Sequence, residues 1–472
     1  MDVRRTKIVA TVGPATSLPQ SMRALLAAGA DVVRLNAAHG TADVNSQHAN
    51  LARDTAAALG RVVGVLVDLP GPKMRTGPVV DDEIRLETAS ELTLTSAAVI
   101  GDAHRVSTTV PELARWVGPG DDIYLADGAI VLHVERVVDA DVVCEVVRGG
   151  VLRSRKGMHV PRAESHVESF TDADAAALRM AIAIKADFIG LSFVRRPEDV
   201  EGVRARLPKR RNRPQLVAKI ETAVALDHLP GIVGVADAVM VARGDLGIQV
   251  PARRVPLIQK EIIRFCNLAG KPVITATQML ESMTRSPLPT RAEVNDVANA
   301  VLDGTDALML SEETAVGEYP ADTVRTMSEV AEAAEAWPRA RTTPQGAAAA
   351  LDDDRVAWAV AHASVQAAED LGVAAIVCPT QSGTTARRVA AFRPAVPIAG
   401  ISAQPDVLGR LCLVWGVRPL TASAVEGEDG LRHAVKAARD CGLAHKGDLI
   451  AIVSASPGER AGATDTVRIV LA

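Results

Sequence analysis

Short runs of β-branched and other apolar residues recur along the first two thirds of the chain, and polar or charged residues follow each run. A pattern with helical spacing follows each run in turn. Eight such runs occupy residues 8–12, 32–36, 63–68, 188–193, 215–219, 238–243, 273–277 and 307–311. Continuous apolar runs are typical of parallel strands that are covered on both faces. The pattern therefore predicts an α/β fold with a TIM (β/α)8 barrel, and an open doubly wound sheet is the alternative.

The alternation breaks once, between Asp68 and about Ser165. Short alternating strand patterns and Gly/Pro turns fill this stretch, which predicts an inserted all-β domain that can close over the barrel as a lid. A second α/β series follows, with apolar runs at 374–378, 397–401 and 449–453 that predict an open sheet. We expect a first barrel segment at 1–69, a β-barrel lid at 70–165, a second barrel segment at 166–340 and a C-terminal α/β domain at 341–472.

Composition and charge narrow the class of protein. The chain has 472 residues, of which 48% are hydrophobic and 23% charged, values typical of a globular protein with more than one domain. It contains no uninterrupted apolar run of about 18 residues, so we expect no membrane span. Five scattered cysteines without metal-ligand spacing indicate reduced thiols and a cytoplasmic location. The net charge is −5, and the one basic cluster, residues 209–213, is interpreted as a solvated loop, so no nucleic-acid partner is expected.

Two carboxylates follow neighbouring predicted strands. Glu221 comes just after the fifth strand and Asp245 just after the sixth, so a barrel would bring them together at its carboxyl end. Such a pair, with positions left open for substrate and water, suits Mg²⁺ or Mn²⁺. Alternatively, Glu221 caps the following helix and Asp245 forms a turn. Lys219 favours the metal site, because a lysine on the same side of the strand can neutralise a phosphoryl group during transfer.

Other polar residues lie at the ends of the remaining strands. Residues 244–247 would supply flexible backbone whose N–H groups can approach an anion closely. Thr277 would place a hydroxyl at the same mouth, unless it only caps its strand. A group on the opposite rim indicates an anion site when taken as a set, although each member alone is a candidate for a surface ion pair. The group comprises Arg34, Asn36, His39, Asp68, Lys73 and Arg75.

Several of these residues lie in longer motifs that resemble those of the pyruvate kinase family. The resemblance covers almost the whole chain, and its most specific motifs are at residues 7–16, 218–221, 240–247, 276–283, 289–293 and 296–304. It implies transfer of the phosphoryl group of phosphoenolpyruvate to ADP, giving pyruvate and ATP. It also implies a mobile lid and a homotetramer.

By motif position, the resemblance implies that Glu221 and Asp245 bind Mg²⁺ and that Lys219 stabilises the moving phosphoryl group. Arg34 would bind the substrate phosphate, and the amides of Gly244 and Asp245 would bind its carboxylate. The residue beside the enolpyruvate carbon that is protonated would be Thr277. The positions that match the nucleotide side are Asn36, His39, Arg75 and Lys156. The expected catalytic set is Lys219, Thr277, Arg34 and Arg75.

The sequence departs from the family pattern at the position of the activating K⁺. Ala38 replaces a serine whose hydroxyl is a K⁺ ligand in the family. The remaining candidates for a monovalent-cation position are Asn36, Asp68 and Leu69. Lys73 stands where K⁺-dependent members have a glutamate, and an ammonium group can take the place of a monovalent cation. We therefore expect activity that does not require K⁺.

Three further departures bear on catalytic strength. Glu312 replaces a glycine beside the mouth, adds negative charge and would strain the backbone if positive φ is required there. Arg162 replaces the glycine of the usual lid hinge, and Ala173 replaces a lysine. These three departures also permit a second interpretation, in which the protein is a regulatory paralogue that binds nucleotide or phosphoenolpyruvate but turns over poorly. A Mg²⁺-dependent aldol lyase acting on pyruvate enolates is a third possibility. The lid, Lys219, the rim arginines and the C-terminal domain argue against it.

One C-terminal loop resembles the loop that holds an effector phosphate in regulated members. Its hydroxyls and backbone precede a predicted helix, an arrangement that suits an anion. On this interpretation we expect allosteric control by a sugar phosphate or AMP, whereas a purely structural helix cap is the alternative. The residues concerned are Thr380, Ser382, Gly383, Thr384 and Thr385.

Overall fold

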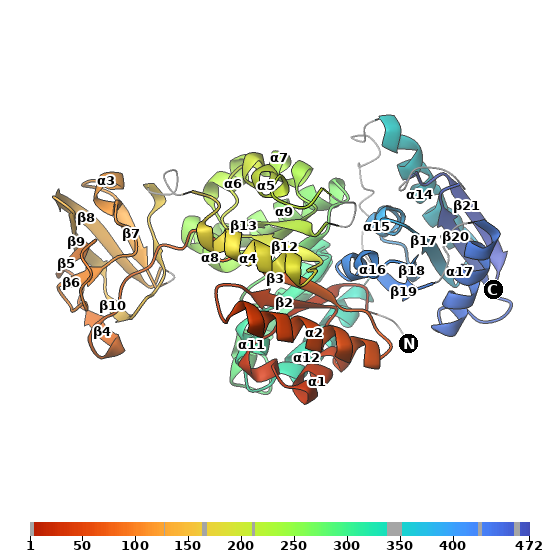
Figure 1. Ribbon diagram of the computed structural model, residues 1–472, viewed down its shortest axis with the longest axis horizontal. Coiled ribbons are helices and arrows are strands. Elements are labelled where there is room, and N and C mark those ends of the chain that lie inside the picture. The colour runs from red at the N-terminus through yellow and green to blue at the C-terminus, as the bar shows by residue number, and fades with distance from the viewer. Residues whose placement is uncertain are drawn as a thin grey trace.

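The computed structural model describes residues 4–126, 128–162, 168–209, 213–337, 352–422, 427–456 and 463–472. Three bodies follow one another along its longest axis, with an all-β domain at one end, a barrel in the middle and an α/β domain at the other end (Figure 1). The predicted fold class is confirmed. Two of the expected domain boundaries, 165/166 and 340/341, fall on residues outside the described ranges.

Eight parallel strands close into the central barrel in the order β1-β16-β15-β14-β13-β12-β3-β2. Nearly all of their residues are buried, because side chains fill the inside and helices cover the outside, which explains the apolar runs of the sequence. All eight predicted strands are present, with small shifts at their ends. Their bounds are β1 (Lys7–Thr11), β2 (Val32–Asn36), β3 (Gly64–Asp68), β12 (Phe188–Leu191), β13 (Gln215–Ile220), β14 (Ala238–Ala242), β15 (Val273–Ala276) and β16 (Ala307–Leu310).

Helices and short turns connect these strands and cover the barrel. Threonine N-caps begin several of them, such as Thr171 before α4 and Thr290 before α10. In both, the threonine hydroxyl accepts the backbone N–H of the third helical residue, whose side chain accepts the backbone N–H of the threonine. The helices are α1 (Pro19–Ala27), α2 (Ala42–Ala58), α4 (Asp172–Ala183), α5 (Pro197–Arg204), α6 (Ala223–Asp227), α7 (Leu229–Val235), α8 (Arg243–Gln249), α9 (Val255–Leu268), α10 (Arg291–Asp303), α11 (Glu312–Ala315) and α12 (Pro320–Glu335), with 3₁₀ turns η1 (Pro14–Thr16), η4 (Ala252–Arg254) and η5 (Glu281–Thr284).

The inserted all-β domain, called the lid below, leaves the barrel after β3 and has its own hydrophobic core, around Leu92, Ile123 and Leu132. In place of the closed β-barrel expected for it, the described strands form a six-stranded sheet, β11-β7-β8-β9-β5-β6, and a two-stranded sheet, β10-β4. The elements are η2 (Val80–Asp82), β4 (Glu83–Leu86), β5 (Glu91–Thr95), β6 (Arg105–Ser107), α3 (Leu113–Trp116), β7 (Asp122–Leu125), β8 (Ile130–Val138), β9 (Asp141–Arg148), β10 (Gly150–Arg153) and β11 (Met158–His159).

The C-terminal domain is an open five-stranded sheet in the order β19-β18-β17-β20-β21, in which only β21 is antiparallel. The three predicted strands are present, but β19 and β21 had not been predicted. Both are edge strands with partly exposed residues, so neither carries a continuous apolar run. The elements are α14 (Asp352–Asp370), β17 (Ala375–Pro379), α15 (Thr384–Ala391), β18 (Ile398–Ser402), α16 (Pro405–Leu411), β19 (Val417–Thr421), α17 (Gly427–Asp440), β20 (Leu449–Ser454) and β21 (Thr466–Leu471).

The two attached domains occupy opposite ends of the barrel. The lid continues from the carboxyl end of β3, whereas the C-terminal domain packs on the amino-terminal ends of the strands. There, Lys7 Nζ at the start of β1 donates a hydrogen bond to the carbonyl of Val417, at 2.8 Å. The carboxyl end of the barrel is therefore left to the lid. Among the described residues, no helix combines the length and apolar character that crossing a membrane requires.

Candidate active site

Lys219 lies at the centre of a buried polar cluster inside the carboxyl end of the barrel. Its ammonium nitrogen is 2.9 Å from Glu221 Oε1 and 3.2 Å from Asp68 Oδ2, and it donates a hydrogen bond to Ser192 Oγ at 2.8 Å. Asp68 reaches it across the intervening strand β12. Gly190 permits this, because a Cβ there would lie 2.3 Å from Asp68 Oδ1. Three strands therefore converge on one ammonium group.

Burial and charge shift the pKa values of this cluster in opposite directions. Burial lowers the pKa of Lys219, but the carboxylates of Asp68 and Glu221 more than offset this, so it lies above its ordinary value. Burial raises the pKa of Asp68, but Lys219 and Arg34 outweigh that effect and bring it to about 2. Burial raises the pKa of Glu221 and nearby Asp245 raises it further, despite Lys219. Lys219 therefore forms ion pairs with both carboxylates, and the pKa of Glu221 remains raised despite this pairing because it is buried close to Asp245.

The residues fit a divalent metal with incomplete protein coordination. Glu221 Oε2 accepts a hydrogen bond from the backbone N–H of Phe193 at 2.6 Å, which orients the carboxylate. Glu221 Oε1 is buried and forms an ion pair with Lys219 Nζ at 2.9 Å. Asp245 lines the same cavity. No cluster of three His, Cys, Asp or Glu suited to a metal occurs in the described part of the chain, so substrate oxygens and water would have to complete the ligand sphere.

A cavity of about 70 Å³ opens above this cluster and collects most of the predicted substrate residues. Arg34 is fixed at its wall, where Nη2 donates to Asp68 Oδ2 at 2.6 Å and Nη1 to Thr11 Oγ1 at 3.1 Å. Asp68 forms ion pairs with both Arg34 and Lys219, so these two cations lie side by side at one wall of the cavity. The predicted residues that line it are Arg34, Asn36, Asp68, Leu69, Lys73, Lys219, Glu221, Asp245 and Thr277.

The segment 244–247, expected to be a flexible loop, is part of helix α8. Gly244 has no positive φ, and a Cβ added to it would make only ordinary van der Waals contacts, so the local helix, and not glycine flexibility, shapes this backbone. The amide of Gly244 donates to Thr277 Oγ1 at 2.8 Å. This bond brings the ends of the sixth and seventh strands together. The amide of Gly244 is therefore hydrogen-bonded to Thr277, whereas the family resemblance assigns this amide to the substrate carboxylate.

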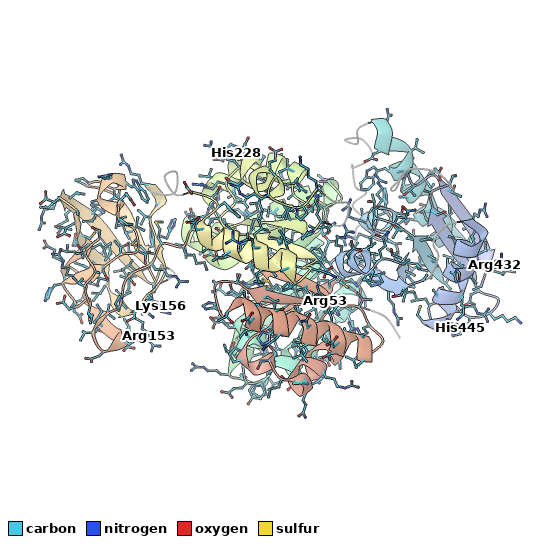
Figure 2. All side chains as sticks on the ribbon, viewed as in Figure 1. Arg53, Arg153, Lys156, His228, Arg432 and His445 are labelled. Atoms are coloured by element: carbon cyan, nitrogen blue, oxygen red, sulfur yellow. The ribbon has the colours of Figure 1, made fainter. Side chains whose placement is uncertain are left out.

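Three of the four predicted nucleotide residues line a larger cleft between the lid and the barrel, with a volume of about 360 Å³. Arg75 Nη1 is held by the carbonyl of Arg155 at 3.0 Å, and Arg75 forms a bridge with Gly157, so the basic residues occupy the base of the lid. Lys156 lies on the side of the lid that faces the barrel (Figure 2). His39 lies on the opposite wall. Asn36 lies in the smaller cavity instead, where its Oδ1 accepts the N–H of Ala38 at 3.1 Å.

The positions that depart from the family pattern have different surroundings. Lys73 lines both the cavity and the cleft, and Ala38 lines the cavity. Glu312 begins helix α11 at the cleft wall without positive φ, so the backbone strain considered for it is not present. Arg162 pairs with Asp121 of the lid at 3.4 Å. Ala173 lies exposed in the first turn of α4.

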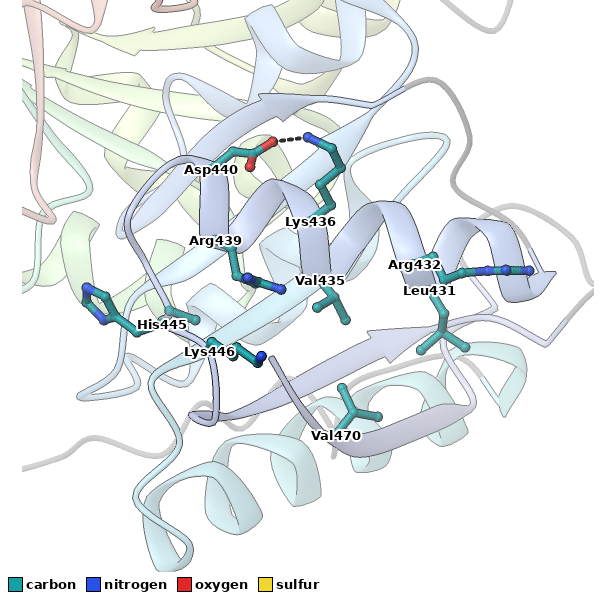
Figure 3. Close-up of a pocket in the computed structure, with 10 residues that line it drawn as sticks. Leu431, Arg432, Val435, Lys436, Arg439, Asp440, His445, Lys446 and Val470 are labelled. Atoms are coloured by element: carbon teal, nitrogen blue, oxygen red, sulfur yellow. Dashed lines mark hydrogen bonds and ion pairs between the residues drawn. The ribbon is translucent and has the colours of Figure 1, made fainter.

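The loop after β17 is held together by its own hydroxyls. Thr380 Oγ1 accepts the N–H of Gly383 at 2.9 Å, Ser382 Oγ donates to Thr384 Oγ1 at 3.0 Å, and the hydroxyls of Thr385 and Thr464 lie 2.8 Å apart. Gly383 has φ of 83° and is the N-cap of α15. A hollow of about 830 Å³ lies elsewhere in this domain, between α17 and β21, where Leu431 and Val435 point toward Val470 (Figure 3). The loop and this hollow are separate features.

Comparisons with known proteins agree with this architecture. A family model described as the barrel domain of pyruvate kinase matches residues 3–324, and one described as its alpha/beta domain matches residues 358–470. The chain belongs to the pyruvate kinase family. It is 39% identical to the pyruvate kinase of Thermotoga maritima over 468 residues, 99% of each chain. It is 41% identical to that of Geobacillus stearothermophilus over 473 residues, 99% of this chain and 80% of the other.

Membership of the pyruvate kinase family makes the chain a phosphotransferase and implies dependence on a divalent metal. The match extends over the barrel and the α/β domain, and neither an aldol lyase nor a regulatory paralogue that turns over poorly is better supported by it. Sequence reasoning had not singled out Ser192, Phe193 or Thr11, which hold Lys219, Glu221 and Arg34. Ser192 could have been found, because it is the polar residue near the end of the fourth apolar run.

Proposed function

We propose that the cavity at the carboxyl end of the barrel transfers the phosphoryl group of phosphoenolpyruvate to ADP, with the residue roles implied by motif position. The observation that carries this proposal is the ammonium group of Lys219, held between Asp68 and Glu221 beside an open cavity. A buried cation with a raised pKa stays charged through the reaction. It can therefore stabilise the negative charge on a phosphoryl group that passes between donor and acceptor.

The reaction breaks the P–O bond to enolpyruvate and forms a P–O bond to the β-phosphate of ADP. Arg34 binds the phosphoryl group from one wall, while Arg75, Lys156 and His39 bind the nucleotide in the cleft. The electron pair of the broken bond remains on the enolate of pyruvate. That enolate takes up a proton at its methylene carbon, beside Thr277, through a chain of water. Closure of the lid over the cleft excludes bulk water from transfer.

We propose Mg²⁺, or Mn²⁺ in its place, as the divalent metal at Glu221 and Asp245. When bound, it neutralises substrate oxygens and draws negative charge toward itself. The two carboxylates that line one cavity, Glu221 and Asp245, support this assignment. The ammonium of Lys73 takes the place of K⁺, because it lines the same cavity as Asn36, Asp68 and Leu69.

Domain roles follow the same proposal. Residues 1–69 and 166–340 form the catalytic barrel, 70–165 the lid and 341–472 a domain that can carry an effector site. An anionic effector, a sugar phosphate or AMP, would bind at residues 380–385, and the protein would act as a cytoplasmic homotetramer. The internal bonding of the loop suits a helix cap equally well. A flat activity response to both effectors at sub-saturating phosphoenolpyruvate would remove the regulatory part of the proposal.

A coupled assay of pyruvate formation tests the main proposal. We expect pyruvate from phosphoenolpyruvate only when ADP and a divalent metal are both present. Lys219→Met should lower kcat by at least about 10²-fold, the scale expected for loss of one preorganised charge. Lys260→Met is the matched control, because Lys260 also pairs with an aspartate, Asp303, but on the outside of the barrel. Full activity of Lys219→Met, with thermal unfolding showing a folded protein, would refute the assigned role.

A further inference from the structure

The guanidinium group of Arg243 joins three neighbouring parts of the barrel mouth. Nε donates to the carbonyl of Ala276 at 3.2 Å, and Nη2 donates to the carbonyls of Thr277 at 2.6 Å and Gln278 at 3.2 Å. Nη1 donates to both carboxylate oxygens of Asp296 on α10, at 2.6 and 2.8 Å. Only 10% of the Arg243 side chain is exposed. The side chain therefore connects the start of α8, the end of β15 and helix α10.

The backbone that Arg243 contacts is strained. Thr277 has φ of 67° and Gln278 has φ of 53°, both in the left-handed region. A β-branched residue rarely adopts this region, and such a conformation persists only where its surroundings hold it. Strand β15 ends at Ala276, so the carbonyls of Thr277 and Gln278 lie beyond its ladder. Arg243 supplies donors to the carbonyls of both left-handed residues.

The strained backbone aims the hydroxyl of Thr277. Thr277 Oγ1 accepts the N–H of Gly244 at 2.8 Å and donates to the carbonyl of Ala276 at 2.7 Å, and the residue lines the cavity above Lys219. A relaxed backbone at Thr277 would change the direction of its Cα–Cβ bond and move the hydroxyl away from these partners. Arg243 contacts the carbonyl of the same residue, so it lies where it can hold the backbone that aims this hydroxyl.

We propose that Arg243 is a positioning residue for protonation of the enolate, acting through Thr277 and held in place by Asp296. It touches neither substrate nor metal in this role. An arginine is required because its planar group carries donors that point to the carbonyls and the carboxylate at once, whereas a lysine carries a single nitrogen. The inference rests on the proposed placement of Thr277 beside the carbon that is protonated.

The protonation step can be measured in reverse, separately from the complete reaction. With Mg²⁺ and ATP present, the enzyme should exchange the methyl hydrogens of pyruvate with D₂O, which proton NMR follows directly. We expect Arg243→Lys to slow this exchange and kcat by about tenfold or more, with the KM for phosphoenolpyruvate changed less than about threefold. Thr277→Ala should show the same pattern. The double variant should be no slower than Thr277→Ala alone, because both substitutions act on one group.

Asp296→Asn provides a milder variant, which keeps the side chain of Arg243 and removes the charge that holds it. We expect a smaller loss of exchange in the same direction. Arg204→Lys is the matched control, because Arg204 also joins a carboxylate, Asp237, and a carbonyl, that of Val235, but at the amino-terminal end of the barrel. It should affect thermal stability without a selective loss of exchange.

Two results would overturn the inference about Arg243 alone, and a third would remove its basis. If Thr277→Ala slows the exchange but neither Arg243→Lys nor Asp296→Asn does, Arg243 has no positioning role and the proposed function of Thr277 stands. If the losses of Arg243→Lys and Thr277→Ala multiply in the double variant, Arg243 acts independently of Thr277. If Thr277→Ala leaves the exchange unchanged, the proposed role of Thr277 fails and the inference about Arg243 fails with it.

Discussion

The ammonium group of Lys219 is surrounded by groups from three different strands and the loops after them. Its relation to Glu221 is local, because residues two apart on a strand point to the same side. Its contacts with Asp68 and Ser192 are not local, since these residues precede it by more than a hundred positions and by 27 positions respectively. The chemistry of the site thus depends on single side chains whose partners are distant in the sequence.

Lys73 provides a prediction at the same scale. We expect the rate to change less than about twofold when NaCl is replaced by KCl at constant ionic strength, because the Lys73 ammonium already lies at the cavity. Lys73→Glu should lose most activity in NaCl, since it adds an unneutralised carboxylate near Asp68, and should regain activity in KCl. Lys73→Gln separates loss of the cation from gain of the anion. Strong K⁺ stimulation of the unsubstituted enzyme would contradict the prediction.

Individual helices contribute to the site through the way they begin. The motif at 289–293 forms the N-terminus of α10, where Thr290 Oγ1 accepts the N–H of Glu293 and Glu293 accepts the N–H of Thr290 at 2.7 Å. Glu293 also accepts hydrogen bonds from the N–H and hydroxyl of Ser282. This capping box anchors the helix that carries Asp296, the partner of Arg243. A motif that resembles a family signature therefore has a structural explanation.

Thr290→Ala tests this capping box. Loss of the side-chain acceptor should lower the free energy of unfolding by about 1 kcal/mol, the usual cost of removing a threonine N-cap. Thr290→Ser keeps the hydroxyl and should cost only a small part of this. Chemical denaturation followed by circular dichroism measures both variants, provided that the transition is cooperative. Equal stabilities for the alanine and serine variants would show that the cap does not stabilise the barrel.

At the scale of the whole molecule, the junction between the barrel and the C-terminal domain is built from buried charge. Helix α16 lies so close to the barrel floor that a Cβ on Gly409 would meet Asp187 Oδ1 at 2.1 Å. Asp187 Oδ2 accepts the N–H of Val65 at 2.8 Å and lies 4.0 Å from Arg53, which lies on the barrel near the C-terminal domain (Figure 2). Arg410 and Asp406 of α16 also act on it. Burial is the dominant effect and raises the pKa of Asp187 to about 7.

This junction should make stability depend on pH. Because the pKa of Asp187 is raised from 3.8 to about 7 on folding, its carboxyl costs nothing below pH 3.8 and destabilises the fold progressively as pH rises toward 7. Asp187→Asn should therefore gain thermal stability relative to the unsubstituted protein between pH 5 and about pH 8, measured by calorimetry. Asp102→Asn is the control, since hydrogen bonds with the backbone of His104 and Arg105 lower the pKa of that exposed carboxyl. A constant difference in melting temperature over this pH range would contradict the prediction.

The pattern of apolar and polar residues was sufficient to predict the eight barrel strands, the inserted all-β domain and the C-terminal sheet. It also predicted that Lys219, Glu221, Asp245 and Thr277 lie at strand ends. These features could be predicted because the periodicity of a segment and its burial on both faces determine which residue types it contains. The edge strands β19 and β21 lack that burial and were missed. The helical form of residues 244–247 was missed too, because glycine permits several conformations and its neighbours select among them.

Tertiary structure decided which strand ends face one another and how their side chains are held. The pairing of Asp68 with both Arg34 and Lys219 and the support of Lys219 by Ser192 depend on strand order around a closed barrel. The strained conformation of Thr277 and its contact with Arg243 likewise arise from packing between consecutive βα units. The physical reason is sequence separation: neighbouring residues set the period and burial of each element, whereas these side-chain contacts join residues that are far apart in the chain and exist only once the strands have paired.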